Sequence, residues 1–303
     1  MTSQTITAAA AGSWKLGDLT VNRVGFGAMR LTADADGRPS DRNRAIAVLR
    51  KAVELGVNHI DTAAFYFSPT RSANELINRA LSPYPDDLVI TTKVWPGRDP
   101  SGEWWWAEPA QLRGQVEENL RQLGRDHLDV VNLRIPRSAQ TESLAEHFGV
   151  LAELRDAGLI RHLGVSNVRP EHLAEAQAVA PVVCVQNPYG VGGASPEDRA
   201  FLDACGEQGV AFVPFFAIAG DGRESGVSGT DNAEVLAVAR AHGVSPAQIR
   251  LAWTLRQGSH VLAIPGTGNP DHLADNVAAG ALRLSDDEMA RLNAVGPDPA
   301  PQP

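Results

Sequence analysis

This chain of 303 residues has little cysteine and no long apolar segment. It contains two cysteines, Cys184 and Cys205, so we expect no disulfide framework, and neither cysteine lies in a spacing typical of metal ligands. No apolar run approaches the roughly 20 residues that a helix needs to cross a membrane. These absences predict a globular protein with no membrane span and no structural metal.

A secretory leader and an excess of basic residues are also missing. The N-terminal segment, MTSQTITAAAAGSW, has neither the basic region nor the long apolar region of a leader, so we expect the protein to be cytoplasmic. Acidic residues outnumber basic ones by 36 to 27, and the net charge of −9 argues against nonspecific binding to nucleic acid. A local basic pocket for one phosphate group is still compatible with this charge.

Short runs rich in β-branched residues alternate with longer amphipathic segments along almost the whole chain. The expected strands are Val24–Met29, Asn58–Ala63, Leu88–Val94, Leu128–Arg134, Ile160–Val165, Val182–Gln186, Ala211–Phe215 and Val261–Ile264. The expected helices include Asp41–Leu55, Pro109–Leu123, Glu142–Ala157, Pro170–Ala178, Pro196–Gln208 and Ser245–Gln257. Eight such units without a central linker predict one α/β domain over residues 1–303, a (β/α)8 TIM barrel.

A doubly wound sheet is the alternative fold, and it usually carries a glycine fingerprint after its first strand. The segment Gly25–Met29 reads GFGAM, which does not match GxGxxG and so favours the barrel. Residues Ser13–Val21 have the alternation and the turn of a β-hairpin, placed before the first barrel strand. The ends of the chain, residues 1–11 and 296–303, are expected to be mobile tails.

Polar side chains lie at the ends of three successive expected strands: Asp61 on the second, Lys93 on the third and Arg134 on the fourth. Tyr66 follows Asp61 on the loop after the second strand. The C-terminal ends of the strands form the active site of a TIM barrel. A lone acid at such a position is more often part of an ion pair, but three strand ends in order together with a tyrosine favour catalysis. A buried Lys93 paired with Asp61 would hold a cation beside the Tyr66 hydroxyl. That cation would favour the phenolate and suit Tyr66 to exchanging protons.

Asp61, Tyr66 and Lys93, in this order along one barrel, resemble the aldo-keto reductases. The resemblance runs from Val24-Gly25-Phe26-Gly27 to Asn276 and so covers almost the whole chain. It implies a barrel plugged at the bottom by the N-terminal hairpin, and an NAD(P)H-dependent enzyme that reduces an aldehyde or ketone. In such an enzyme hydride leaves the nicotinamide while Tyr66 protonates the carbonyl oxygen.

The resemblance also implies residues for the cofactor. The family's GVSN motif occurs here at Gly164–Asn167, so Ser166, Asn167 and Gln186 are expected to hold the nicotinamide carboxamide. Phe215 matches the aromatic residue that stacks on the nicotinamide ring. The full implied set is Met29, Ser166, Asn167, Gln186, Phe215, Phe216, Ala217, Ile218, Gly220, Ile264, Gly266, Thr267, His272, Asp275 and Asn276.

Two positions in the last part of this set depart from the family. Gly266 stands where many members have lysine, and His272 stands where many have arginine. In the family this segment binds the adenosine end of the cofactor, at a helix N-terminus whose N–H groups favour an anion. Both changes remove permanent positive charge. NADPH is therefore the expected cofactor, with NADH possible and a smaller preference for NADPH than in arginine-bearing relatives.

The fourth strand carries the largest departure, because Arg134 takes the place of the family's usual histidine. A guanidinium is a fixed fork of donors that can hold a carbonyl oxygen but does not shuttle protons. The variant sequence Asn132-Leu133-Arg134 resembles a bacterial branch that includes pyridoxal reductases, so pyridoxal is a candidate substrate. Arg134 also keeps two alternatives open: an isomerase or dehydratase that uses bound NADP, and a cofactor-binding regulatory protein with weak turnover.

Aromatic residues gather near the expected substrate entrance. Phe67 follows Tyr66 where the family commonly has glycine, and Trp95, Trp104 and Trp105 lie in the segment after the third strand. Each of these rings alone is as compatible with packing at the rim as with substrate binding. Together they favour a flat or aromatic small-molecule carbonyl substrate.

Overall fold

The computed structural model describes residues 6–33, 40–136, 143–215, 217–218 and 232–296. Two expected cofactor residues, Phe216 and Gly220, lie outside the described residues, and so do the outer parts of both expected tails. No helix in the described segments is long and apolar enough to cross a membrane.

Seven parallel strands form one curled sheet with the order β13-β12-β11-β10-β7-β4-β3. They are β3 (Phe26–Gly27), β4 (His59–Asp61), β7 (Val89–Val94), β10 (Leu128–Arg134), β11 (Ile160–Ser166), β12 (Val182–Gln186) and β13 (Ala211–Phe212). The expected eighth strand closes the ring through two parallel bridges, Val261 to Phe212 and Ala263 to Val24. The predicted (β/α)8 barrel is confirmed.

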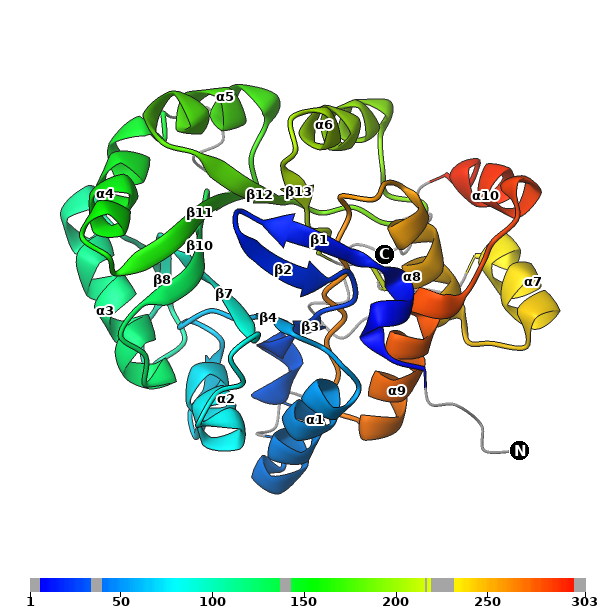
Figure 1. The fold of residues 1–303 in the computed structure, drawn as a ribbon, viewed down its shortest axis with the longest axis horizontal. Helices are drawn as coiled ribbons and strands as arrows, with labels where there is room; N and C mark the ends of the chain where they lie inside the picture. The colour runs from blue at the N-terminus through cyan, green and yellow to red at the C-terminus, as the bar shows by residue number, and fades with distance from the viewer. Residues whose placement is uncertain (1–5, 34–39, 137–142, 216, 219–231, 297–303) are drawn as a thin grey trace.

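Helices surround the sheet on its outer side (Figure 1). They are α1 (Arg42–Glu54), α2 (Ala73–Leu81), α3 (Leu112–Leu123), α4 (Ala145–Asp156), α5 (Pro170–Val179), α6 (Pro196–Glu207), α7 (Ala233–His242), α8 (Pro246–Arg256), α9 (Pro270–Ala278) and α10 (Asp286–Asn293). Single 3-10 turns are η1 (Ala8–Ala11), η2 (Ala28–Leu31), η3 (Pro109–Gln111) and η6 (Ala279–Ala281). Proline at the first helical position and a serine cap start both α6 and α8, as their sequences predict.

The N-terminal hairpin closes the bottom of the barrel, as predicted. Strands β1 (Ser13–Leu16) and β2 (Leu19–Asn22) pair antiparallel and lie across the barrel opening in Figure 1. Leu16 and Val21 are fully buried and pack with Val130 and other inward-facing residues near the axis. The preceding η1 is also packed, since Ala8 is buried and its N–H donates to the carbonyl of Leu55, so the expected mobile tail does not extend this far.

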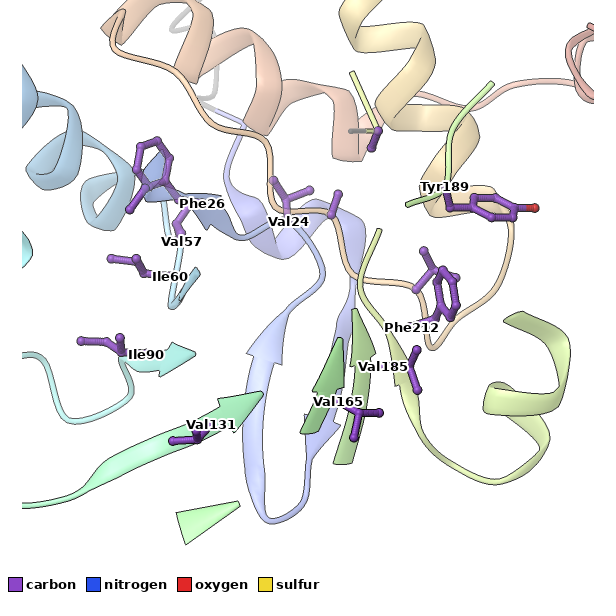
Figure 2. Close-up of a cluster of buried hydrophobic side chains, with 14 of the residues drawn as sticks. Val24, Phe26, Val57, Ile60, Ile90, Val131, Val165, Val185, Tyr189 and Phe212 are labelled. Atoms are coloured by element: carbon purple, nitrogen blue, oxygen red, sulfur yellow. The ribbon is translucent and has the colours of Figure 1, made fainter. Parts of the chain in front are cut away.

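Alternation along the strands separates an apolar outer layer from a polar interior. Ile60, Ile90, Val131, Val165 and Val185 point outward and form the core between sheet and helices (Figure 2). Their neighbours in sequence point into the barrel. At the C-terminal ends of the strands these inward residues are polar, so the fold itself gathers them at one mouth.

Two short hairpins lie among the loops at this mouth. Strand β5 (Phe67–Ser68) pairs with β6 (Arg71–Ser72), and β8 (Pro96–Arg98) pairs with β9 (Trp104–Trp106). Neither was among the predicted strands, because each arm is only two or three residues long. The first barrel strand is also shorter than predicted, since residues 28–31 turn into η2.

Candidate active site

The three residues that suggested a catalytic centre lie together at the barrel mouth. Asp61 ends β4, Lys93 lies near the end of β7, and Tyr66 follows on the loop after β4. Lys93 Nζ donates to Asp61 Oδ1 at 2.6 Å and to the carbonyl oxygen of Thr62 at 3.0 Å. The two side chains are almost fully buried, with 2% of Lys93 and 3% of Asp61 exposed. Lys93 Nζ lies 4.9 Å from the centroid of the Tyr66 ring, so the buried ion pair faces the tyrosine.

A neutral histidine lies one layer below this pair. His59 Nε2 lies 3.0 Å from Thr91 Oγ1, and the ring is fully buried. Burial lowers the pKa of His59 to about 4; nearby Asp61 opposes this effect and Lys93 adds to it. His59 therefore carries no charge near neutral pH, and Lys93 is the cation that faces Tyr66.

Arg134 projects from the end of β10 on the other side of the mouth. Its Nη1 donates to Ser166 Oγ at 3.1 Å, and its Cζ lies 4.9 Å from the centroid of the Phe215 ring. Parallel pairing sets this contact, because Arg134 and Ser166 are register partners on neighbouring strands. Arg134 is thus held beside two residues that the sequence assigned to the cofactor.

A pocket of about 270 Å³ opens at the mouth between these groups. All four expected catalytic residues line it, and so do many of the expected cofactor residues. The lining is Gly27, Met29, Arg30, Asp61, Tyr66, Lys93, Arg134, Gln186, Pro214, Phe215, Ala217, Ile218, Ile264, Pro265 and Gly266.

The remaining expected cofactor residues that the structure describes lie outside this lining. Ser166 is buried behind Arg134, and Asn167 has a left-handed backbone (φ 59°) and donates from Nδ2 to the carbonyl of Ile135. Thr267 and Asn276 are largely buried. His272 and Asp275 are exposed on the first turns of α9.

The backbone is closely packed at Gly266, where many family members have lysine. A Cβ on Gly266 would lie 2.7 Å from the carbonyl oxygen of Gly27, and a Cβ on Gly27 would lie 2.6 Å from that of Ile264. Real side chains do not tolerate such contacts with backbone. The two glycines therefore form a seam where the first and last barrel segments meet, and no longer side chain fits there without a shift.

Two of the four expected substrate residues lie together beside the pocket. Phe67 and Trp105 line a neighbouring cavity of about 550 Å³, which Lys93 also touches. Trp104 is 55% exposed, and its ring lies edge-on to Phe65 at 5.5 Å. Trp95 is buried instead and stacks on His147 with the ring centroids 3.9 Å apart.

Sequence reasoning missed Arg30, which lines the pocket beside Met29. Arg30 follows the first expected strand, so the rule that selected the other strand-end residues also applies to it. No cluster of three or more histidine, cysteine or acidic side chains in the described residues could hold a metal ion. Burial raises the pKa of the Cys184 thiol to about 12, which fits a core residue rather than a nucleophile.

Comparison with known proteins agrees with this geometry. The model of the aldo/keto reductase family matches residues 23–297. A pyridoxine 4-dehydrogenase from Escherichia coli is 41% identical, over 94% of this chain and 98% of its own. A methylglyoxal reductase from the same organism is 31% identical, over 93% of this chain and 94% of its own.

A solved structure shows the same architecture. The structure of an aldo-keto reductase from Klebsiella pneumoniae in complex with NADPH superposes with a TM-score of 0.74. It is 27% identical and covers 93% of each chain. The matched family model and the extent of these similarities show that the chain belongs to the aldo/keto reductase family.

Proposed function

We propose that this protein reduces an aldehyde or ketone with NADPH, with Tyr66 as the general acid. The buried Lys93–Asp61 pair beside Tyr66, inside the pocket at the barrel mouth, is the observation that carries the proposal. A cation next to the phenol favours its ionised form, so Tyr66 releases its proton more readily to a carbonyl oxygen. Arg134 donates hydrogen bonds to that oxygen and stabilises the negative charge that develops on it.

The pocket also suits a nicotinamide cofactor. Phe215 offers a ring face, Met29 borders the same space, and Gln186 Oε1 is buried there without a hydrogen-bond partner among the described residues. These residues would hold the nicotinamide, and His272 and Thr267 would hold the adenosine end. When bound, the cofactor supplies the hydride. The family relationship and the NADPH complex of the Klebsiella relative support this choice.

An aromatic carbonyl is the proposed substrate class, with pyridoxal as the first candidate. The cavity that includes Phe67 and Trp105 adjoins Lys93 and offers aromatic surface for a planar ring. The name of the Escherichia coli relative, a pyridoxine 4-dehydrogenase, supports the same class. Small-molecule carbonyls of this kind are the first to test.

The experiment follows nicotinamide absorbance while the protein is mixed with NADPH and a panel of aromatic aldehydes including pyridoxal. We expect steady turnover of at least one aldehyde, and a loss of roughly 10²–10⁴-fold in Tyr66→Phe because the positioned acid is gone. NADPH binding should change little, since the ring still packs. Tyr84→Phe is the matched control: Tyr84 Oη donates to the Leu123 carbonyl on the outer side of the barrel. Wild-type turnover in Tyr66→Phe would remove Tyr66 from the mechanism.

A further inference from the structure

Gln186 makes a contact that the cofactor role expected for it does not explain. It ends β12, is fully buried, and donates from Nε2 to Asp61 Oδ2 at 2.8 Å. A carboxylate can only accept, so the amide nitrogen must be the atom that faces Asp61. The amide oxygen, Oε1, then faces away from Asp61. It is buried without a partner among the described residues, and Gln186 lines the pocket.

Asp61 therefore has two donors, one on each oxygen. Lys93 Nζ donates to Oδ1 at 2.6 Å, and Gln186 donates to Oδ2. The two donors share the negative charge of one carboxylate. Because Gln186 also binds Asp61, the carboxylate neutralises the Lys93 ammonium less completely. That ammonium faces the Tyr66 ring.

We propose that Gln186 is a positioning residue that acts on Tyr66 through Asp61 and Lys93, and that couples this chain to cofactor binding through Oε1. This inference rests on the proposed function for its cofactor. An amide that accepts a hydrogen bond at its oxygen becomes a better donor at its nitrogen. A carboxamide N–H that binds Oε1 thus strengthens the bond from Nε2 to Asp61. Lys93 is then less neutralised by Asp61, and its charge favours the Tyr66 phenolate more strongly.

The unpaired oxygen supports this reading over a purely structural one. A buried carbonyl without a hydrogen bond is unfavourable, and an apolar side chain of similar size would avoid it. Glutamine keeps a donor toward Asp61 and a free acceptor toward the pocket at the same time. No aliphatic side chain supplies both.

The test measures the pH at which the Tyr66 hydroxyl ionises in the protein without substrate. The chain has three tyrosines. Burial raises the pKa of Tyr84 to about 12 and also raises the pKa of Tyr189. The phenolate transition of Tyr66 is identified by its loss in Tyr66→Phe. In Gln186→Met the transition should move to higher pH, by about half a unit or more, because one hydrogen bond to Asp61 is lost.

Gln186→Glu tests whether a hydrogen-bond donor to Asp61 is needed at position 186, because the introduced side chain donates only while it is protonated. A protonated carboxyl keeps both an O–H donor and a carbonyl acceptor, whereas two ionised carboxylates cannot share the site. At low pH this variant should bind NADPH as wild type does, and its NADPH affinity should deviate from that of wild type once the introduced carboxyl and Asp61 lose the proton that they share. Gln177→Met is the control: it makes the same substitution at an exposed glutamine of α5, whose side chain donates to Gln208 and has no hydrogen bond to Asp61, so the phenolate transition should stay in place.

Binding provides the second readout. Coupling between two sites is reciprocal, so a cofactor that favours the phenolate must bind more tightly above the transition than below it. We expect NADPH affinity, measured by tryptophan quenching, to rise across the transition in wild type and to stay flat in Gln186→Met. An unmoved transition in Gln186→Met, or a wild-type rise in affinity in that variant, would overturn the inference.

These measurements need no turnover. Even if the protein reduces none of the aldehydes, the phenolate transition and the NADPH affinity can still be measured. Failure of the proposed function and failure of the Gln186 inference are therefore distinguishable. Thermal unfolding of each variant shows whether it is folded. If Gln186→Met is unfolded, the NADPH affinity of Gln186→Glu, measured at low and at high pH, still gives both outcomes.

Discussion

Arg134 is the residue that most distinguishes this site from its family's usual pattern. Its guanidinium is fixed by Ser166 Oγ and by the face of Phe215, and it lines the pocket with Tyr66. A histidine at this position could lose its proton near neutral pH, but arginine cannot. In the proposed mechanism the charge beside the carbonyl oxygen is therefore permanent, and proton transfer is left to Tyr66.

Replacing Arg134 with methionine tests that role. If Arg134 stabilises charge that develops on the substrate oxygen, kcat and kcat/KM should fall together by roughly 10²–10³-fold, with little change in NADPH affinity. Arg134→His should recover part of the rate and add a pH dependence near neutrality. Single-turnover kinetics at saturating NADPH measure the hydride step directly. An unaffected step combined with weaker NADPH binding would show instead that Arg134 braces Ser166 and Phe215.

At the scale of elements, the seam between the first and last barrel segments restricts where the protein can carry a positive side chain that binds the phosphate of the cofactor. Gly27 N donates to the carbonyl of Pro265 at 3.2 Å, and a Cβ on Gly266 would lie 2.7 Å from the carbonyl oxygen of Gly27. By contrast, His272 lies exposed on the first turn of α9, where a longer side chain meets no such barrier. We therefore expect that a positive side chain can be introduced at position 272 on α9, but not at position 266 in the seam.

We accordingly expect opposite results from two substitutions that each add a cation. His272→Arg should increase the preference for NADPH over NADH, because arginine makes bidentate contacts to phosphate. Gly266→Lys should weaken binding of both cofactors and lower the free energy of unfolding by about 1–3 kcal/mol, through overpacking against backbone. Gly268→Lys is the matched control, since a Cβ there meets its nearest atom at an ordinary 3.7 Å. Dissociation constants and urea unfolding check all three, and tighter NADPH binding in Gly266→Lys would contradict the steric argument.

The same elements show what could be predicted from the sequence. Strand order and the residues at strand ends follow from alternation and from parallel pairing, so the sequence alone predicts that Asp61, Lys93 and Arg134 lie at one end of the barrel. The eighth strand was placed correctly, but Pro265 lacks an N–H and follows at once, and only single bridges form. The alternation of apolar and polar residues does not by itself predict where a strand stops pairing with its neighbours.

Tertiary contacts decided the features that were not predicted. Trp95 has a left-handed backbone (φ 93°), and its amide and carbonyl bond to the side chain of Gln115, which turns the ring onto His147. Nothing near Trp95 in the sequence predicts that orientation. Likewise, the bond from Gln186 to Asp61 joins residues 125 positions apart. Local pattern gives the barrel, while the detailed contacts of the site depend on which side chains meet across it.

At the scale of the whole molecule, a buried histidine under the active site ties stability to pH. Burial lowers the folded-state pKa of His59 to about 4, against about 6.5 for an unperturbed histidine. Between these values the unfolded chain binds a proton that the folded protein excludes, so stability rises with pH and is lost as pH falls below about 6.5. Protonation inside the barrel would add a second cation close to Lys93, which no described acid except Asp61 is placed to offset.

We expect the free energy of unfolding to fall by about 2 kcal/mol between pH 7 and pH 5 from this one group, added to the changes from all other titrating groups. His59→Leu removes the group, so its stability should fall by about 2 kcal/mol less over the same range, even if it is less stable at pH 7. His272→Gln, at an exposed position on α9, should keep the wild-type slope. Urea unfolding at the two pH values measures the difference. Equal slopes for wild type and His59→Leu would mean that His59 accepts a proton in the folded barrel, and that Lys93 shares the interior with a second cation at mildly acidic pH.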